Sequence, residues 1–110
     1  MVIRVWEATV TRENERTYLD AVRRDVLPRL ADVSGYLGAM FGARDHSDGR
    51  AYTVFTFWES MDAVITLTSG HPDRAWVPDS IRATLQRVGE SAVQLDVSVA
   101  HDLERLQSAS

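Results

Sequence analysis

The chain has 110 residues, a formal net charge of −4, 45% hydrophobic residues and no cysteine. This length and composition are typical of one globular domain with a real core, and the missing cysteines exclude disulfides and thiolate chemistry. The acidic balance argues against nucleic acid and anionic membranes as partners, and without a transmembrane run or a signal peptide we expect a soluble, cytoplasmic protein.

The first elements are a strand and a long amphipathic helix. Residues 2–10 are rich in β-branched and aromatic types, which predicts a strand, and Thr11 is placed to cap the helix that follows. Pro28 lies inside the helical pattern, so we expect a kink or an early break there, and Ser34-Gly35 ends the helix. The buried stripe of this helix has spacings of three and four residues and consists of Tyr18, Val22, Val26, Leu30 and Val33.

A hairpin and a second helix follow. Residues 36–44 predict a second strand, weakened by two glycines, and the polar residues 45–50 predict a turn. Residues 51–58 predict a third strand that is apolar on both faces and therefore needs cover on both sides. Ser60 offers its hydroxyl as an N-cap for a helix that stops at Gly70. The inward side chains of this helix are Met61, Val64, Ile65 and Thr68.

The last third of the chain predicts one more short helix and one more strand. Pro78-Asp79 suits a helix start, and the buried stripe before Gly89 consists of Ile81, Leu85 and Val88. Residues 91–100 alternate apolar and polar side chains, which predicts a fourth strand. The polar tail at residues 101–110 is expected to fray.

The elements come in the order strand, helix, strand, strand, helix, strand. That order predicts an α+β, ferredoxin-like domain with a four-stranded antiparallel sheet over residues 1–100, followed by the polar tail at 101–110. The helices are too few to cover both faces of the sheet, and the strand at 51–58 is apolar on both. We therefore expect a second copy to cover the open face in a sheet-on-sheet homodimer.

Three segments carry a resemblance to a known family. They are Pro28, the run Ser34-Gly35-Tyr36-Leu37-Gly38 before the second strand, and the run Phe57-Trp58-Glu59-Ser60-Met61-Asp62-Ala63 after the third. With the element order over residues 2–99, they make the chain resemble the antibiotic biosynthesis monooxygenase-like family of dimeric α+β barrels. The resemblance implies a cavity between the helices and one face of the sheet. Members include cofactor-independent oxygenases of polycyclic phenols and anthrones, quinol oxygenases and heme-degrading enzymes.

The family's functional residues carry over only where this chain matches them. The anthrone-oxygenase type pairs a tryptophan that matches Trp58 with an asparagine and a tyrosine, at positions where this chain has Val54 and Val64. Trp58 alone therefore carries over. The heme-degrading type uses an asparagine, a tryptophan and a histidine, at places that here hold approximately Glu7, Leu67 and Val77.

Trp58 is accordingly the first candidate catalytic residue. Its indole N–H can orient a phenolic oxygen and its ring can stack on a flat substrate. The alternative is a tryptophan that packs the end of the strand under a helix. Tyr52 shares the same side of the predicted strand and is a candidate wall of a substrate pocket.

The segment His71-Pro72-Asp73-Arg74-Ala75-Trp76 is the densest cluster of reactive residue types. His71 can take a phenolic proton near neutral pH or ligate a heme iron, but Pro72-Asp73 also make an ordinary helix start that leaves His71 in solvent. Trp76 either closes over the sheet or forms a lid on an apolar pocket. Arg74 and Trp76 are candidate substrate-binding residues.

The first predicted strand carries unusual polar residues. Arg4 and Trp6 share one face, and Glu7 lies on the other. Trp6 is a further candidate for substrate binding. A buried charge is costly unless it is paired, so Glu7 either lines a functional cavity, as a candidate base, or pairs with an arginine. For Asp96 we favour a structural ion pair, and Arg4 is its expected partner if the outer strands are neighbours.

These observations lead to one main hypothesis. The chain is expected to be a homodimeric, cofactor-independent monooxygenase that deprotonates a small aromatic or polyketide-type substrate with His71 or Glu7 and holds the anion beside molecular oxygen. Two alternatives remain open. One is a heme-binding or heme-degrading protein with His71 as axial ligand, and the other is a cyclase or small-molecule binder that uses the same pocket without oxygen.

Overall fold

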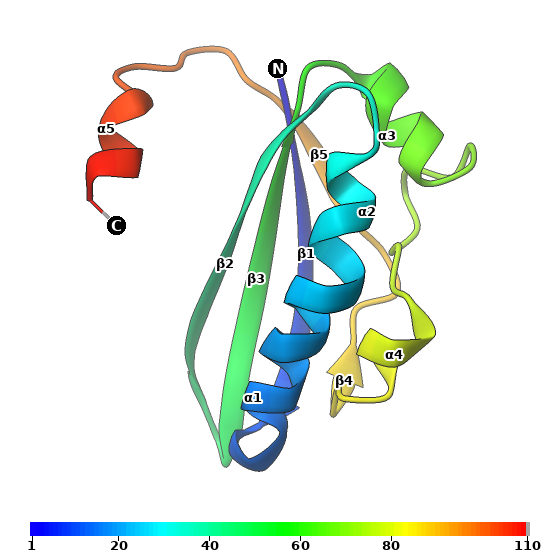
Figure 1. Cartoon of the computed structure of the whole chain (residues 1–110), viewed down its shortest axis with the longest axis vertical. Coiled ribbons are helices and arrows are strands. Elements are labelled where there is room, and N and C mark those ends of the chain that lie inside the picture. Colours follow the sequence, from blue (N-terminus) through cyan, green and yellow to red (C-terminus); the bar gives the residue numbers. More distant parts are fainter. Residues whose placement is uncertain (110) are drawn as a thin grey trace.

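The computed structural model describes residues 1–109, and its helices α1 to α4 lie on one side of an antiparallel sheet (Figure 1). No helix of the described residues is long and apolar enough to cross a membrane. In chain order the elements are β1 (Val2–Thr11), α1 (Arg12–Ala21), the π-helix η1 (Val22–Val26), α2 (Leu27–Ala31), β2 (Tyr36–His46), β3 (Gly49–Trp58), α3 (Met61–Leu67), α4 (Asp79–Arg82), β4 (Arg87–Val88), β5 (Val93–Asp96) and α5 (Glu104–Ser108).

The strands form one sheet in the order β2-β3-β1, with β4 and β5 both paired to the free edge of β1. The α+β class and the ferredoxin-like arrangement are therefore confirmed. The central strand β1 pairs with β3 along its whole length, from Val2 to Thr11. Because this register places Arg4 beside Thr56 and Trp6 beside Val54, the unusual residues of β1 lie in the middle of the sheet.

The predicted fourth strand is shorter than expected. β5 covers Val93–Asp96 instead of residues 91–100, because its partner β1 begins at Val2, which lies opposite Asp96. The remaining edge of β1 is taken by β4, which pairs with it further along the strand. The pairing with β1, and not the alternation of apolar and polar side chains, thus sets the length of β5.

Pro28 does not end the first helix. The helical column runs from Arg12 to Ala31, and a π-helical turn at Val22–Val26 comes immediately before the first turn of α2, where Pro28 lies. A π-turn carries an extra residue, which changes the hydrogen-bond pattern just where the proline lacks its N–H. At the start of the column the predicted cap is confirmed, because the Thr11 hydroxyl accepts a hydrogen bond from the Asn14 N–H.

Two later helices differ from the sequence prediction. Ser60 occupies the N-cap position of α3, but its side chain makes no capping hydrogen bond to any described residue. α4 is a single turn that ends at Arg82, and Val88 belongs to β4. The helix stops because the Gln86 N–H donates to the Thr9 carbonyl (2.9 Å), which draws the chain toward the edge of the sheet. Ile81 is buried as predicted.

Two of the three sequence segments that carry the family resemblance meet in the structure. The Glu59 N–H donates to the Gly35 carbonyl (2.8 Å), and Gly35 has a φ of 94°. A Cβ added at Gly35 would lie 2.9 Å from the Cβ of Ala63, which is too close. The glycine therefore allows the end of the first helix to pack against the start of α3.

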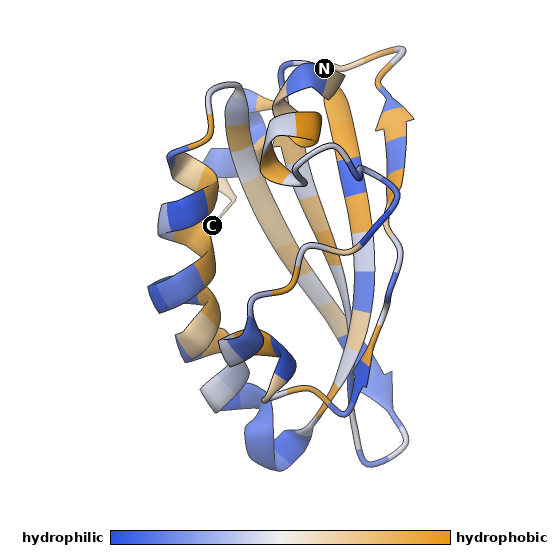
Figure 2. Ribbon diagram, turned by 90° about the vertical axis from the view of Figure 1, so that its right-hand side faces the viewer, coloured by the Kyte–Doolittle hydropathy of each residue, from blue (hydrophilic) through white to orange (hydrophobic). Residues whose placement is uncertain are grey.

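The sheet has one covered face and one open face. Figure 2 shows the column of α1, η1 and α2 along one side of the sheet, and the core lies between them. Residues of this core from both layers include Val10, Tyr18, Leu30, Tyr52, Trp58 and Val64. The open face carries Phe55 and Phe57, and its outer strands expose Met40 (43%), Val93 (59%) and Leu95 (49%).

The tail contains a helix where fraying was expected. α5, Glu104–Ser108, is exposed along its length and stands apart from the sheet (Figure 1). Its start is held by local backbone bonds, such as the one from the Arg105 N–H to the Asp102 carbonyl (3.0 Å). Ser110, the last residue of the predicted tail, lies outside the described residues.

Candidate functional site

A small cavity of about 50 Å³ lies between the covered face of the sheet and the helices. Its lining is mostly apolar and includes Trp6, Phe41, Val54, Trp76 and Ile81. Three polar side chains also border it, namely Arg4, Tyr18 and Thr56. An apolar enclosure with a few polar groups is the usual form of a small-molecule site, so this cavity is the candidate functional site.

The walls of the cavity come from both layers of the fold. Adjacent strands β1 and β3 supply the floor, and the Trp6 indole is fixed by a hydrogen bond from its Nε1 to the Gly89 carbonyl (2.6 Å). The segment 75–78 closes the opposite side without regular secondary structure. There the Arg29 guanidinium lies 5.2 Å from the centre of the Trp76 ring, a cation–π contact on the outer side of the wall.

Arg4 is a buried cation, with 5% of its surface exposed. Its guanidinium donates to the carbonyl oxygens of Pro72 (2.6 Å) and Arg74 (2.5 Å) and to the side-chain oxygen of Gln94. Burial lowers the pKa of Arg4. All of these acceptors are neutral, and no carboxylate among residues 1–109 forms an ion pair with Arg4.

The expected ion pair between Arg4 and Asp96 is therefore wrong. The register of β1 and β5 places Gln94 opposite Arg4 and Asp96 opposite Val2, at the end of the sheet. Asp96 is exposed there and needs no partner to offset burial. The amide of Gln94 orients the guanidinium without neutralising it.

Tyr18 contributes a polar atom that has no partner. Its side chain is 1% exposed, and its hydroxyl is the buried side-chain oxygen for which no hydrogen bond exists within the described chain. Burial, followed by the neighbouring Tyr52, raises the pKa of Tyr18. The ring packs edge-on against the Tyr52 ring, with a centroid distance of 5.1 Å. A buried hydroxyl without a partner is uncommon and calls for an explanation.

Trp58 lies in the core, and it is not among the residues that line the cavity. It is fully buried, its Nε1 donates to the Thr56 hydroxyl (2.8 Å), and its ring packs edge-on against Tyr36. The indole N–H is thus already paired within the protein. In this arrangement Trp58 supports the floor of the cavity through Thr56, which does line it.

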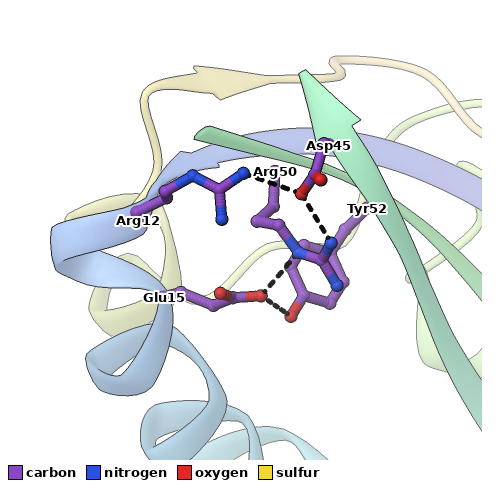
Figure 3. A network of polar contacts seen from close by, with 5 residues as sticks. All are labelled: Arg12, Glu15, Asp45, Arg50 and Tyr52. Carbon is purple, nitrogen blue, oxygen red and sulfur yellow. Dashed lines mark hydrogen bonds and ion pairs between the residues drawn. The ribbon is translucent and has the colours of Figure 1, made fainter. Parts of the chain in front are cut away.

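Tyr52 belongs to a polar network at the far end of the sheet (Figure 3). Its hydroxyl donates to Glu15 Oε2 (2.5 Å), and the same oxygen accepts from Arg50 Nε (3.1 Å). Asp45 then bridges Arg50 and Arg12. Burial and the Glu15 carboxylate raise the pKa of Tyr52 to about 12, and the hydrogen bond from Tyr52 is the main cause that lowers the pKa of Glu15.

The two candidate bases lie outside the cavity. The His71 side chain is exposed, and so is that of Arg74, whose backbone carbonyl is the group that faces Arg4. Glu7 lies on the open face of the sheet, in a hollow of about 230 Å³ that is also lined by Arg44 and Arg87. The structure therefore brings Trp6 and Trp76 together but separates them from both bases.

The comparison with protein families decides what kind of domain this is. A family model described as antibiotic biosynthesis monooxygenase matches residues 1–72. The chain belongs to the antibiotic biosynthesis monooxygenase family. The match includes β1 to α3, which together form the floor and the helical wall of the cavity. No curated protein matches the chain.

Solved structures of the family have the same fold. A monooxygenase from the ActVA-Orf6 gene of Streptomyces coelicolor, in complex with nanaomycin D, is similar at a TM-score of 0.59 and 20% identity, covering 91% of this chain and 89% of that one. The heme-degrader MhuD from Mycobacterium tuberculosis, with two hemes in its active site, is similar at a TM-score of 0.57 and 19% identity, covering 92% and 99%. At these identities the likeness is one of fold.

The cavity does not fit a heme in the arrangement that the structure describes. Its volume is about 50 Å³, and none of the histidines of residues 1–109 lines it. His71, the expected axial ligand, has its side chain in solvent. Within the same residues no group of three or more histidine, aspartate or glutamate side chains is arranged to hold a metal ion.

Sequence reasoning considered Arg4 only for a structural ion pair and assigned Tyr18 to the core. The helical stripe that contains Tyr18 is otherwise aliphatic, and a lone tyrosine in such a stripe was the available signal. Whether its hydroxyl finds a partner depends on residues from other elements, which the periodicity of one helix does not show. Arg4 and Tyr18 are therefore the polar residues of the site that the structure adds.

Proposed function

We propose that this family member is a cofactor-independent monooxygenase that acts on a small, flat, electron-rich aromatic or polyketide-type substrate in the cavity between sheet and helices. The observation that carries the proposal is the lining of this cavity. Aromatic rings of Trp6, Phe41 and Trp76 form the walls, and the buried cation of Arg4 borders it without a carboxylate among the described residues. Such a lining suits the anion of a phenol or enol.

The proposed reaction needs no reductant besides the substrate. The substrate loses a proton to give its anion, and the anion gives electrons to O₂ with formation of a C–O bond and a peroxide. A second C–H bond and the O–O bond then break, leaving a C=O group on the product and releasing the other oxygen atom as water. The CH₂ carbon is oxidised and O₂ is fully reduced, so R₂CH₂ + O₂ gives R₂C=O + H₂O.

His71 is the proposed base for the first step. Glu7 lies on the open face, whereas His71 begins the segment that continues to Trp76 and the other cavity residues at 77–78. An imidazole at the entrance can take the phenolic proton as the substrate enters. The anion would then pass into a site that already contains a cation.

Binding requires the cavity to open. An apolar cavity of about 150 Å³ binds benzene in another protein, and the volume here is about 50 Å³. Hydrogen bonds to Arg4, Glu90 and Ala92 hold residues 72–75 in place, so the segment at residues 76–77, which has no regular secondary structure, is the part of the wall that can move at least cost. We propose that Trp76 on this segment acts as a lid that shifts outward when a ring enters.

We also propose that two copies pair through the open face of the sheet. Met40, Val93 and Leu95 are large apolar side chains that remain exposed on this face, beside the half-buried Phe55 and Phe57. Such a patch suits a second copy of the same sheet. Light scattering should give the mass of two chains, and Leu95→Asp should reduce it to one. A wild-type mass of one chain at micromolar concentration would refute the pairing.

Oxygen uptake tests the proposed function. Wild-type protein is mixed with naphthols, anthrones and related phenols in an oxygen electrode, and we expect uptake of one O₂ per substrate with no hydrogen peroxide left in solution. Val54→Phe, which fills the cavity, should abolish the uptake. Product formation without oxygen would identify a cyclase instead, and binding without any product would identify a binder.

A further inference from the structure

We infer that the Tyr18 hydroxyl and the Arg4 guanidinium together bind an anionic oxygen on the ligand of the cavity. The inference takes one element from the proposed function, namely the kind of ligand. This ligand is a flat ring with an ionised phenol or enol oxygen. The site itself is inferred from two side chains of different elements, α1 and β1, that border the same cavity.

The first argument is the state of Tyr18. Its hydroxyl is buried and lacks a hydrogen-bond partner within residues 1–109, although the whole ring packs in the core. Leaving such a group unpaired is unfavourable, and phenylalanine would fill the same space without that cost. A tyrosine at this position is therefore explained if the hydroxyl donates a hydrogen bond to a ligand in the cavity that it borders.

The second argument is the charge of Arg4. Its contacts are two backbone carbonyls and the Gln94 amide, so the guanidinium is held in place while its charge is not offset by a carboxylate of the described chain. The Nε–H makes no hydrogen bond to a described residue. Buried charges are normally paired, and an anionic ligand oxygen would supply the missing counter-charge.

The two polar groups select the charge of the ligand, and the aromatic walls select its shape. A fixed cation and a fixed O–H donor in an apolar enclosure stabilise an anion strongly, because little water competes for it. The flat walls formed by Trp6 and Trp76 favour a ring that carries this oxygen. A water molecule could satisfy the Tyr18 hydroxyl, but it would leave the charge of Arg4 without compensation.

The inference is tested with para-nitrophenol, whose neutral and ionised forms have different absorption spectra. We expect wild-type protein to bind the anion and to lower the apparent pKa of the bound dye. Tyr18→Phe should weaken anion binding by roughly 10- to 100-fold, the range for a hydrogen bond to a charged group. It should leave the affinity for neutral nitrobenzene unchanged.

Two further variants make the result specific. Tyr36→Phe removes a hydroxyl on the same side of the sheet but away from the cavity lining, and it should bind the dye like the wild type. Arg4→Lys keeps the charge and should retain part of the shift in the dye pKa. Should Arg4→Lys fail to fold, the comparison of Tyr18→Phe with Tyr36→Phe decides alone.

The outcomes separate this inference from the proposed function. Binding of the dye in its neutral form, no binding by the wild type, or equal anion binding by Tyr18→Phe would each overturn the inference. Anion binding that depends on Tyr18, in a protein that consumes no oxygen with any phenol, would support the site and refute the monooxygenase. Oxygen uptake that is unchanged in Tyr18→Phe would refute the site and leave the monooxygenase.

Discussion

The Arg4 guanidinium donates a hydrogen bond of 2.5 Å to the carbonyl oxygen of Arg74, and it thereby joins the central strand to the segment that closes the cavity. The bond to the Pro72 carbonyl does the same two residues earlier in the chain. Arg4 consequently has two roles that can be measured separately. It holds the wall of the site in place, and its charge is available to a ligand.

Replacing Arg4 by methionine should destabilise the protein. The substitution removes the donors to the carbonyls of Pro72 and Arg74 and to the side chain of Gln94 and leaves these partly buried acceptors unpaired, which should lower the free energy of unfolding by roughly 1–3 kcal/mol. Urea denaturation measures the effect. Arg23→Met is the control, because Arg23 is exposed and its contact with Asp20 is long. Equal effects of the two substitutions would contradict the structural role of Arg4.

Tyr18→Phe should leave the stability of the ligand-free protein unchanged or raise it by up to about 1 kcal/mol, because the hydroxyl that it removes has no partner within the described residues. Tyr52→Phe offers the opposite case. It removes a hydroxyl that donates to Glu15 and should cost roughly 0.5–1.5 kcal/mol. Thermal or urea unfolding compares the two variants, and a clear loss of stability in Tyr18→Phe would mean that its hydroxyl is paired.

The buried tyrosines predict a loss of stability at alkaline pH. Burial and the Glu15 carboxylate raise the pKa of Tyr52 from 10.0 to about 12, and burial raises that of Tyr18. The folded state therefore favours the protonated phenols, and their contribution to stability is present below pH 10 and is lost as the pH rises through the folded pKa of Tyr52.

Ultraviolet titration of the phenols checks this prediction. In the native protein the tyrosines should ionise above pH 10, and in denaturant they should all ionise near it. Tyr52→Phe should remove part of the alkaline loss of stability. Identical titration curves in the native and the denatured protein would show that Tyr18 and Tyr52 are in contact with solvent.

Gly35→Ala should destabilise the fold by roughly 1–3 kcal/mol, the usual cost of a side chain at a positive φ. The added Cβ would also lie 2.9 Å from the Cβ of Ala63, so α3 would have to shift. Gly42→Ala is the matched control, because no heavy atom of the described residues, apart from the glycine and its two chain neighbours, lies within 4 Å of a Cβ at that position. Chemical denaturation of both variants should separate them, and a neutral Gly35→Ala would contradict the packing of this loop against α3.

Local patterns predicted much of the fold. The strand at residues 2–10, the Thr11 cap, the hairpin and the side chains that alternate on β3 follow from the nature and the spacing of neighbouring residues, and the structure confirms them. Errors occurred where an element distant in sequence determines the end of a strand or a helix. The fourth strand is limited by the start of β1, and the helix expected to reach Val88 ends early because Gln86 pairs with Thr9.

The sequence predicted less of the candidate site than of the fold. Trp6 and Trp76 line the cavity, as their aromatic character suggested, while Trp58 packs below it and the side chains of His71 and Arg74 lie in solvent. The pairing of Arg4 with Asp96 failed because the register places Gln94, two residues before Asp96, opposite Arg4. The significance of Tyr18 depends on a hydrogen bond that is missing, and only the complete packing shows this.

Turnover under isotopically heavy dioxygen tests the central claim most directly. A phenol or anthrone that the protein consumes is incubated in ordinary water under labelled O₂, and the product is analysed by mass spectrometry. The proposed reaction predicts one labelled oxygen atom in the new carbonyl group of the product and the other in water. A product whose new oxygen comes from the solvent, or one that forms equally well without O₂, would contradict the monooxygenase.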